Sequence, residues 1–577
     1  MSQQRDAEHG LEAIAAILLA VVLALCAMIW VTAGVAGVLF GAGWPRMGAS
    51  SVADALIGLP AHFSDPRLAW PQADRSAIPS AAAFYTALSL VLLTIVLLLT
   101  ALKRLHDSGA FSWGDGRSDE RSGARWGSTR DLAALHARRR TLAGPRGARE
   151  GGRLALGFRG GRLMRAEARH ALVVFGPPQS GKSAGVAIPA LLEWDGPAVA
   201  SSIKTDLYQA TVCRREALGE VMVFDPYGLA PARGSTWSPL RGARTWDGAL
   251  STALRMTAAG ELDTSEVKGG GYWSAAAEQR LAPLLWTAAR TGGGVQALVR
   301  WAYGQGDAEL PAILHGLLEK ASDGPGLADV QAAYDAHVAF EAMAGETRSS
   351  VESTVQMLLR AYRSPRVQAS AASCEITPER LLQGAGTLYL IGDSHRSKLL
   401  RPIFLCLLQE LIDHAYHQAT IRGGRLSLPL LLCLDELGNI APLPNLAEVA
   451  STAPSHNIQL VSIFHDLAQA KSRYGSQAHT VINSHRARML LPGVADLETL
   501  RYFSDLLGEH RTRDRDQDRQ VPERRPLAAP ERLRQLPENH ALLVYGRLAP
   551  TQLRLRAYYT DRKLRGLSEQ ARSDVGE

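Results

Sequence analysis

The segment that decides the fold is Ala171-Leu-Val-Val-Phe-Gly-Pro-Pro-Gln-Ser-Gly-Lys-Ser183. Its first five residues form a short apolar run, which is typical of a buried parallel strand. The next eight match the pattern G-x-x-x-x-G-K-[ST], and a stretch with helical spacing follows as far as Trp194. A strand, a glycine-rich loop and a helix in this order predict a phosphate-binding P-loop. The alternative, an ordinary glycine-rich turn, is disfavoured by the elements on both sides.

A P-loop holds phosphate largely through its backbone. Two glycines let successive N–H groups curl around phosphate oxygens, and the start of the following helix adds a partial positive charge. We expect Lys182 to reach the β- and γ-phosphates of ATP and the Ser183 hydroxyl to ligate Mg²⁺. The expected nucleotide-binding residues are those of the loop and the next residue: Gly176, Pro177, Pro178, Gln179, Ser180, Gly181, Lys182, Ser183 and Ala184.

A second strand that ends in acidic residues completes such a site. The apolar run 430–434 is followed directly by Asp435 and Glu436. At a strand tip Asp435 is suited to hold Mg²⁺, and Glu436 is suited to activate the attacking water as a general base. The alternative is a strand that simply ends in two solvated acids, and the presence of the P-loop disfavours it.

Lys182 and Asp435 lie 253 residues apart (435 minus 182), more than a compact nucleotide-binding core needs. Residues 247–379 are rich in Ala, Leu, Arg and Glu, with helical apolar spacing at 272–290, 308–321 and 327–343. Segments that read as strands flank this region: 198–203, 221–224, 386–391, 458–464, 487–491 and 541–545. Their alternation with helices predicts a mostly parallel α/β sheet, interrupted by an all-helical lobe.

Polar side chains follow several of these strands. In open α/β sheets the carboxyl ends of the strands form the ligand crevice, which is where Lys204, Asp206, Asp225, Asp393 and His465 fall. His465 is a candidate sensor of the γ-phosphate, with a purely structural histidine as an equal alternative. Lys204 fits a salt bridge at the edge of the core better than catalysis, and Asp225, which precedes a proline, fits a turn.

Two segments near the N-terminus predict membrane-spanning helices. Residues 13–40 and 81–102 contain no charged residue, and a spanning helix needs about 20 apolar residues. A cleaved signal peptide is disfavoured for the first segment because the run is too long and Arg5 is opposed by Asp6 and Glu8. A buried core helix is the alternative for the second segment.

The flanking charges predict the orientation of this hairpin. The loop 41–80 carries only three arginines, whereas the residues after the second segment are strongly basic: Lys103, Arg104, Arg117, Arg121, Arg125, Arg130 and Arg138 to Arg140. The positive-inside rule therefore places the N-terminus and everything after residue 102 in the cytoplasm.

The composition of the 577 residues, with 46% apolar and 21% charged, excludes a wholly disordered or collagenous chain. Five scattered cysteines without a C-x-x-C pair argue against a disulfide framework or a zinc ribbon and indicate that the bulk of the chain is reduced and cytosolic. A net charge of +7 permits a nucleic acid or an anionic lipid as partner without proving either.

Taken together, these features resemble the TraG/TraD family of type IV secretion coupling proteins, in the actinobacterial style, over nearly the whole chain. The two apolar segments, the P-loop and the acidic pair contribute to the resemblance. Further motifs that carry it are Arg125-Trp126-Gly127, Ser202–Asp206, Val223–Pro226, Thr236–Pro239, Tyr272-Trp273, Asn439–Pro442, Gln459–Gly475 and Asp496–Leu500.

The resemblance implies a hexameric, inner-membrane ATPase that uses ATP and Mg²⁺. Its partners would be relaxase-bound single-stranded DNA, relaxosome or effector proteins, and components of the secretion channel. The catalytic residues would be Glu436, Lys182 and His465, with Ser183 and Asp435 at the metal. His465 stands where the family usually has a glutamine, and the charge of a histidine varies near neutral pH.

Ring ATPases of this kind complete each site with an arginine of the neighbouring subunit, and removing such a finger costs roughly 10³-fold or more in rate. The candidates are Arg486 and Arg488, although a surface or salt-bridge role fits either one alone better. Residues 511–525 mix both charges and predict a solvated loop, with a nucleic-acid contact as the less favoured interpretation.

The sequence thus predicts an α/β protein with a RecA-like P-loop ATPase core, an inserted all-helical domain and an N-terminal transmembrane hairpin. The expected boundaries are 1–105 for the anchor, 106–165 for an Arg-rich cytoplasmic linker, 166–246 and 380–560 for the core, 247–379 for the helical, substrate-recognising insertion, and 561–577 for a C-terminal tail.

The expected function is ATP-driven translocation of single-stranded DNA, or of a DNA–protein complex, into the channel. No aromatic stacking platform is evident in the sequence, so the DNA prediction depends on the resemblance alone. The alternatives are a double-strand DNA translocase, a secretion ATPase for proteins only, or a substrate receptor in which ATP binding only sets assembly.

Overall fold

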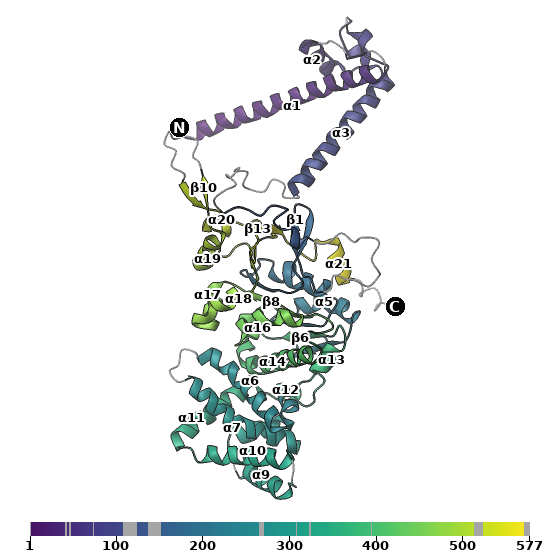
Figure 1. Cartoon of the computed structure of the whole chain (residues 1–577). Helices are drawn as coiled ribbons and strands as arrows, with labels where there is room; N and C mark the ends of the chain where they lie inside the picture. Colours follow the sequence, from purple (N-terminus) through teal and green to yellow (C-terminus); the bar gives the residue numbers. More distant parts are fainter. Residues whose placement is uncertain are drawn as a thin grey trace. The chain divides into compact units, whose positions relative to one another are not determined.

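A computed structural model of the chain describes residues 2–40, 43–44, 48–72, 74–107, 124–136, 152–264, 270–306, 308–321, 325–393, 395–512 and 523–569. The chain divides into two compact units, Met1–Asp115 and Gly116–Glu577, and each is described by itself (Figure 1). Arg117, Arg121 and Arg138 to Arg140, on which part of the predicted orientation depends, lie outside the described residues, as do positions 513–522 of the expected loop and 570–577 of the expected tail.

The first unit contains two long apolar helices, α1 (Ser2–Phe40) and α3 (Ala81–Asp107). Their most apolar windows, Val22–Phe40 and Ala81–Leu98, both have a mean hydropathy of 2.3, and only 33% and 17% of these windows are buried. The core helix of a soluble protein would bury most of such a surface, since exposed apolar area is unfavourable in water. Both helices are therefore long and apolar enough to cross a membrane, as the sequence predicts.

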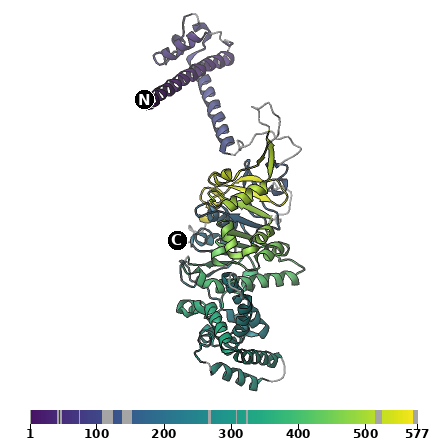
Figure 2. The ribbon, with the colours of Figure 1, turned by 90° about the vertical axis from the view of Figure 1, so that its left-hand side faces the viewer.

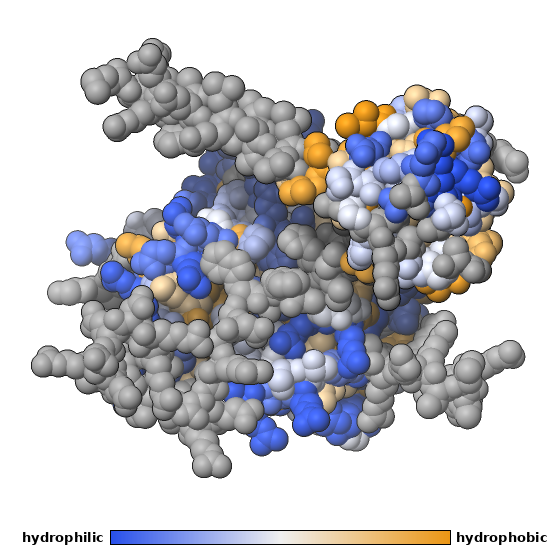
Figure 3. All heavy atoms as spheres, turned by 90° about the horizontal axis from the view of Figure 1, so that it is seen from above, coloured by the Kyte–Doolittle hydropathy of each residue, from blue (hydrophilic) through white to orange (hydrophobic). Residues whose placement is uncertain are grey.

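The segment between these helices folds into a small cap. It contains α2 (Ala49–Gly58) and the short helices η1 (Pro66–Ala69) and η2 (Arg75–Ala77). The fully buried Trp70 packs with Ile29 of α1 and Phe84 of α3. Viewed from above, hydrophobic and hydrophilic side chains are interspersed on the surface of this unit (Figure 3). The connection is thus a packed structure rather than an extended loop.

The second unit is built on one mixed sheet of eleven strands. Seven of them are parallel to one another and form one side of the sheet. In spatial order these strands are β9 (Ala487–Leu490), β3 (Ala171–Phe175), β8 (Ile458–Phe464), β7 (Leu430–Leu434), β4 (Ala198–Ser202), β6 (Thr387–Ile391) and β5 (Val221–Phe224). Each corresponds to a run that the sequence analysis assigns to a strand.

Four antiparallel strands extend the sheet beyond β9. They are β12 (His540–Tyr545), β13 (Thr551–Arg554), β1 (Ala155–Arg159) and β2 (Arg162–Arg165). Residues 155–165 belong to the linker that the sequence predicts, and the structure differs because β1 and β2 pair there. These strands are short, lie at an edge and carry arginines, so their apolar pattern is weak.

Two further segments differ from expectation. The ends of the expected loop 511–525 belong to a hairpin of β10 (Glu509–Thr512) and β11 (Glu523–Pro526). The expected tail contains α21 (Arg562–Glu569), whose Leu564 is fully buried beside α5 (Asp206–Glu216). Both segments are short, and strand pairing or burial of a single leucine is enough to order them.

Both faces of the parallel strands are covered. On β3 the side chains of Val173 and Phe175 face one layer, and those of Leu172 and Val174 face the other. The first layer includes α14 (Ser397–Ile421), α16 (Leu446–Thr452), α17 (Leu467–Tyr474), α18 (Ala478–Ser484) and α19 (Leu497–Leu507). The second includes α4 (Ile188–Glu193) and α5. Burial on both faces explains why these strands read as unbroken apolar runs.

A helical lobe is inserted between β5 and β6, and it gathers at one end of the second unit (Figures 1 and 2). All regular elements in the described residues of this insertion are helices, which confirms the predicted all-helical lobe. They are η5 (Pro239–Arg244), α6 (Trp246–Thr264), α7 (Gly270–Thr291), α8 (Gly294–Ala302), α9 (Glu309–Lys320), α10 (Pro325–Glu341), α11 (Gly345–Leu359), η6 (Arg360–Arg363), α12 (Pro365–Ala369) and α13 (Pro378–Leu382).

One carboxylate of α14 ties the start of this lobe to the sheet layer. Glu410 accepts hydrogen bonds from Trp237 Nε1 at 2.9 Å and from Arg241 Nη1 at 2.8 Å. Arg241 also donates to Glu379 Oε2 at 2.7 Å. Trp237 is only 1% exposed, so its N–H group depends on Glu410 for a partner.

Replacing this carboxylate tests its contribution to stability. Glu410→Leu removes both acceptors and leaves a buried indole N–H unpaired, so we expect the free energy of unfolding to fall by about 2 kcal/mol. Glu410→Gln keeps one acceptor for Trp237 and is expected to lose about half as much. Chemical denaturation of the purified full-length protein measures both values, and equal stability of the wild type and Glu410→Leu would contradict the assignment.

Candidate nucleotide-binding site

The site is formed where three neighbouring parallel strands end. Strand β8 lies between β3 and β7, with Phe175 opposite Phe464 and Leu434 opposite Ser462. Parallel strands present their carboxyl ends at the same edge of a sheet. The loops after β3, β8 and β7 therefore start side by side, although the first and the last are far apart in sequence.

The loop after β3 is bent by residues in the left-handed region. Gln179 has a φ of 67° and Gly181 a φ of 87°, and successive N–H groups in such a turn form a concave binding surface for anions. At Gly176 a Cβ atom would lie 2.5 Å from Ser180 Oγ and 2.9 Å from Leu491 Cδ1, so a larger residue would distort the turn. The helix that begins at Ser183 starts with a π-type turn to Ala187 and continues as α4.

The two distant halves of the site meet directly. Ser183 Oγ donates a hydrogen bond of 2.5 Å to Asp435 Oδ2, and Ser201 Oγ donates one to the Asp435 carbonyl at 3.2 Å. Asp435 is 2% exposed, and burial raises the pKa of its carboxyl group although the bond from Ser183 acts in the opposite direction. Its Oδ1 atom and Ser180 Oγ are buried without a hydrogen-bond partner among the described residues.

Three charged or polar side chains form a chain of contacts beside this pair. Lys182 Nζ lies 3.0 Å from His465 Nδ1 and 3.8 Å from Glu436 Oε1, and His465 Nε2 lies 3.1 Å from Glu436 Oε2. Burial lowers the pKa of Lys182, and the carboxylates of Glu436 and Asp435 partly offset this shift. For Glu436, burial acts to raise the pKa, but the hydrogen bond with His465 and the charges of His465 and Lys182 outweigh it and lower the value.

The backbone and side chain of Glu436 are both held in place. Its φ of 55° lies in the left-handed region, which costs a non-glycine residue on the order of 1 kcal/mol. Asn439 Nδ2 donates to Glu436 Oε2 at 2.7 Å, and Asn439 N donates to the Glu436 carbonyl at 2.9 Å. Gln469 Nε2 reaches Asn439 Oδ1 at 3.4 Å, while its Oε1 accepts from His465 N at 2.8 Å.

Asn439 and Gln469 are members of the site whose contacts the sequence analysis does not predict. Asn439 follows Glu436 by three residues and Gln469 follows His465 by four, spacings that put residues on one side of a helical turn. Both residues also lie in motifs that carry the family resemblance, Asn439–Pro442 and Gln459–Gly475. The structure thus brings together Lys182, Ser183, Asp435, Glu436 and His465 and adds these two amides.

The predicted arginine-finger candidates lie elsewhere in the chain. Arg486 immediately precedes β9, and Arg488 is paired in register with Val173 in the middle of β3. Arg486 forms an ion pair with Glu167 at 2.7 Å, and Arg488 Nη2 donates to the Asn483 carbonyl at 3.2 Å. Neither residue follows the carboxyl end of a strand, so a finger role in a neighbouring subunit stays a prediction.

Other strand-end residues have local roles. Asp225 accepts hydrogen bonds from Gly228 N at 2.9 Å and Ala230 N at 2.6 Å, in keeping with the predicted turn. Asp393 likewise accepts from His395 N at 2.8 Å. Lys204 is exposed and forms no ion pair within the described part of the chain, so the expected salt bridge is not present there.

Comparison with known proteins agrees with this geometry. The family model described as type IV secretory system conjugative DNA transfer matches residues 125–575. Protein VirD4 of Agrobacterium fabrum is 25% identical over 428 residues, covering 71% of this chain and 62% of that protein. Protein VirD4 of Rhizobium rhizogenes is 24% identical over 84% of this chain and 71% of its own length. Conjugal transfer protein TraG of Escherichia coli is 24% identical over 59% of this chain and 55% of its own length. The chain thus spans somewhat over half to about two thirds of the length of these relatives.

Solved structures share the fold. The conjugative coupling protein TrwBΔN70 in complex with sulphate superposes with a TM-score of 0.58 at 19% identity, covering 77% of this chain and 96% of that chain. TrwB in complex with ADP and Mg²⁺ superposes with a TM-score of 0.56 at 18% identity, covering 76% and 94%. The predicted RecA-like α/β fold is therefore confirmed.

The contact between Asn439 and Glu436 generates a prediction. Asn439→Ala removes the amide that fixes Glu436 Oε2, so we expect the kcat of ATP hydrolysis to fall by about tenfold while KM changes less than twofold. Asn439→Gln, which keeps a donor on a longer side chain, should recover part of the rate. Steady-state kinetics of the three proteins checks this, and a loss confined to KM would show that Asn439 does not position Glu436.

Proposed function

The chain belongs to the family of conjugative DNA-transfer proteins of type IV secretory systems, and from this premise we propose that it is a membrane-anchored ATPase that delivers DNA to a secretion channel. The observation that carries the catalytic part is the direct hydrogen bond between Ser183 and Asp435. It joins the P-loop to the acidic strand end, and this is the arrangement that phosphoryl transfer needs.

We assign the phosphates of ATP to the loop Gly176 to Ala184. The left-handed residues in this loop leave backbone N–H groups free to face an anion, and the Lys182 ammonium adds a mobile positive charge. Binding would move Lys182 from His465 to the phosphates, because an ionised phosphate oxygen is a stronger acceptor for an ammonium group than an imidazole nitrogen.

Magnesium fits the same site. The Ser183 hydroxyl and the Asp435 carboxylate offer the oxygen ligands that Mg²⁺ prefers, and the unpartnered Asp435 Oδ1 is a buried acceptor that a cation would satisfy. The bound cation would neutralise charge on the β- and γ-phosphates. Glu436 stays ionised because its pKa is lowered, so it would accept a proton from the water whose oxygen attacks the γ-phosphorus, with ADP as the leaving group.

We also propose how the protein is anchored, how it assembles and what it transports. Helices α1 and α3 would anchor the protein in the cytoplasmic membrane, with the N-terminus and the second unit in the cytoplasm. Six copies would form a ring with a trans arginine at each site, and the helical lobe would recognise the substrate. Single-stranded DNA with its bound relaxase, or effector proteins, would be the cargo.

Two substitutions separate ATP binding from hydrolysis. Lys182→Ala should weaken binding of a fluorescent ATP analogue at least tenfold, because the phosphates lose a direct cation. Glu436→Gln should leave that affinity within about threefold and lower hydrolysis by about 10²- to 10⁴-fold, because the amide cannot accept the proton. Glu216→Gln, which neutralises an exposed carboxylate at the far end of α5, is the matched control and should leave both quantities unchanged.

DNA transfer between cells then tests the motor itself. We expect Lys182→Ala and Glu436→Gln each to abolish transfer in the native host. Transfer at normal frequency by Glu436→Gln would show that the chain acts as a receptor rather than a motor. Stimulation of wild-type hydrolysis by single-stranded but not double-stranded oligonucleotides would separate the proposed cargo from a double-strand translocase, and stimulation by neither would favour protein cargo.

A further inference from the structure

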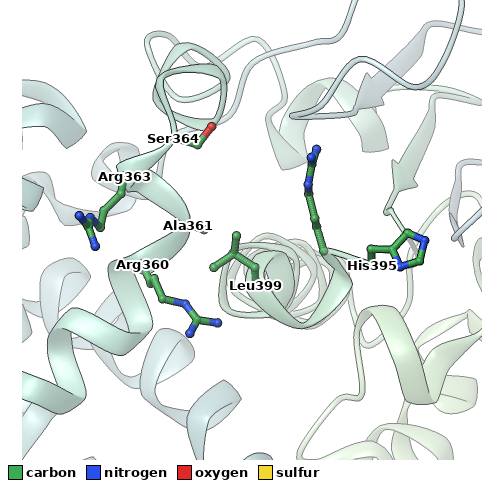
Figure 4. Close-up of a pocket in the computed structure, with 7 residues that line it drawn as sticks. Arg360, Ala361, Arg363, Ser364, His395 and Leu399 are labelled. Atoms are coloured by element: carbon green, nitrogen blue, oxygen red, sulfur yellow. The ribbon is translucent and has the colours of Figure 1, made fainter.

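A basic groove lies where the helical lobe meets the sheet layer, away from the P-loop. It has a volume of about 530 Å³ and is lined by Arg360, Ala361, Arg363, Ser364, His395, Arg396 and Leu399. Arg360, Arg363 and Ser364 come from one side, His395 lies on the other side of Leu399, and Arg360 extends towards Leu399 (Figure 4). We call this feature the arginine groove.

The cations of the arginine groove are only weakly neutralised. Arg360 is exposed and forms no ion pair in the described part of the chain. Arg396 lies over the ring of Tyr227 at 4.6 Å, and its distance to the Asp393 carboxylate is 3.9 Å. Arg363 lies over the ring of Tyr303 at 5.2 Å. An aromatic face orients a guanidinium without cancelling its charge, so these groups remain available to an anion.

The arginine groove shares an edge of the sheet with the nucleotide site. His395 and Arg396 follow β6, and β4 separates β6 from the acidic strand β7. Strand β4 leads into Lys204, an exposed cation that contributes to the electrostatic environment of Lys182. Positively charged side chains therefore lie along the carboxyl edge from the lobe towards the P-loop, interspersed with carboxylates such as Asp393, Asp206 and Asp435.

We propose that the arginine groove binds the phosphate backbone of the DNA strand, an inference that rests on the proposed function. Guanidinium groups match phosphate oxygens in geometry as well as in charge. Arg360 and Arg396 come from two separate segments, η6 and the turn before α14, and such an arrangement suits successive phosphates of a chain. The groove would hold the strand without reading its bases.

The test uses the full-length protein in detergent and a fluorescein-labelled oligo(dT). Arg360→Ala/Arg396→Ala should weaken binding by tenfold or more at low salt. The slope of log K against log salt should become shallower by about 1.4, because each phosphate contact to a single strand contributes about 0.7. The matched control, Arg290→Ala/Arg425→Ala, removes the same charge from two exposed arginines outside the groove and should change neither quantity.

Further measurements distinguish loss of the groove contact from misfolding and from failure of the proposed DNA function. The variant Arg360→Gln/Arg396→Gln must show the same loss of oligonucleotide affinity while its thermal midpoint stays at the wild-type value. Misfolding then does not account for the loss. Affinity for a fluorescent ATP analogue must stay at the wild-type value, and inorganic phosphate must not compete with the oligonucleotide at millimolar concentration. The groove proposal is wrong if the groove variants keep the wild-type salt dependence, or if the control variant loses as much oligonucleotide affinity as they do. Either result would leave the proposed DNA function standing. A wild-type protein that binds no oligonucleotide overturns the proposed DNA function as well.

Discussion

The hydrogen bond from Ser183 to Asp435 is the contact on which the rest of the site depends. It spans 252 residues of sequence and requires β3, β8 and β7 to be neighbours in one register. A shift of one residue in any of these strands would turn its buried side chains to the other face of the sheet. The apolar packing on both faces therefore fixes the position of two polar atoms at the edge, and the geometry of the candidate site follows from the burial of the core.

Burying charged side chains at this site is unfavourable, and this explains the polar contacts around Asp435 and Lys182. Asp435 and Lys182 are both nearly buried, and burial disfavours the charged form of each. The carboxylate of Glu436 partly offsets this effect at Lys182, whereas one oxygen of Asp435 keeps no partner among the described residues. A ligand that supplies a cation to Asp435 and phosphates to Lys182 would satisfy both groups. Such a ligand should stabilise the folded protein as well as react in it.

The sequence predicts those parts of the structure whose residue pattern lies within one short segment. Strand β3 and the loop after it combine an unbroken apolar run with glycines at fixed positions, and the acidic pair follows another such run. Strands β1 and β2 were not predictable because an edge strand need not be apolar, and a sequence such as Arg159-Gly-Gly-Arg162 reads as a turn. Asn439 and Gln469 were missed for another reason. The role of an amide depends on which side chain lies beside it, and this is determined only once β7 and β8 are adjacent.

Helix α14 gives the molecule a physical link between the lobe and the sheet. Leu399, in the first turn of α14, lines the arginine groove. Further along the helix, Glu410 accepts hydrogen bonds from Trp237 and Arg241 at the start of the lobe. Eleven residues of α-helix separate these two positions, a distance of about 16 Å at 1.5 Å per residue. Both positions thus belong to one continuous helix, which also contains Pro402. A strand of DNA held in the arginine groove would therefore act on the lobe and on the carboxyl edge of the sheet together, and this edge also carries the nucleotide site.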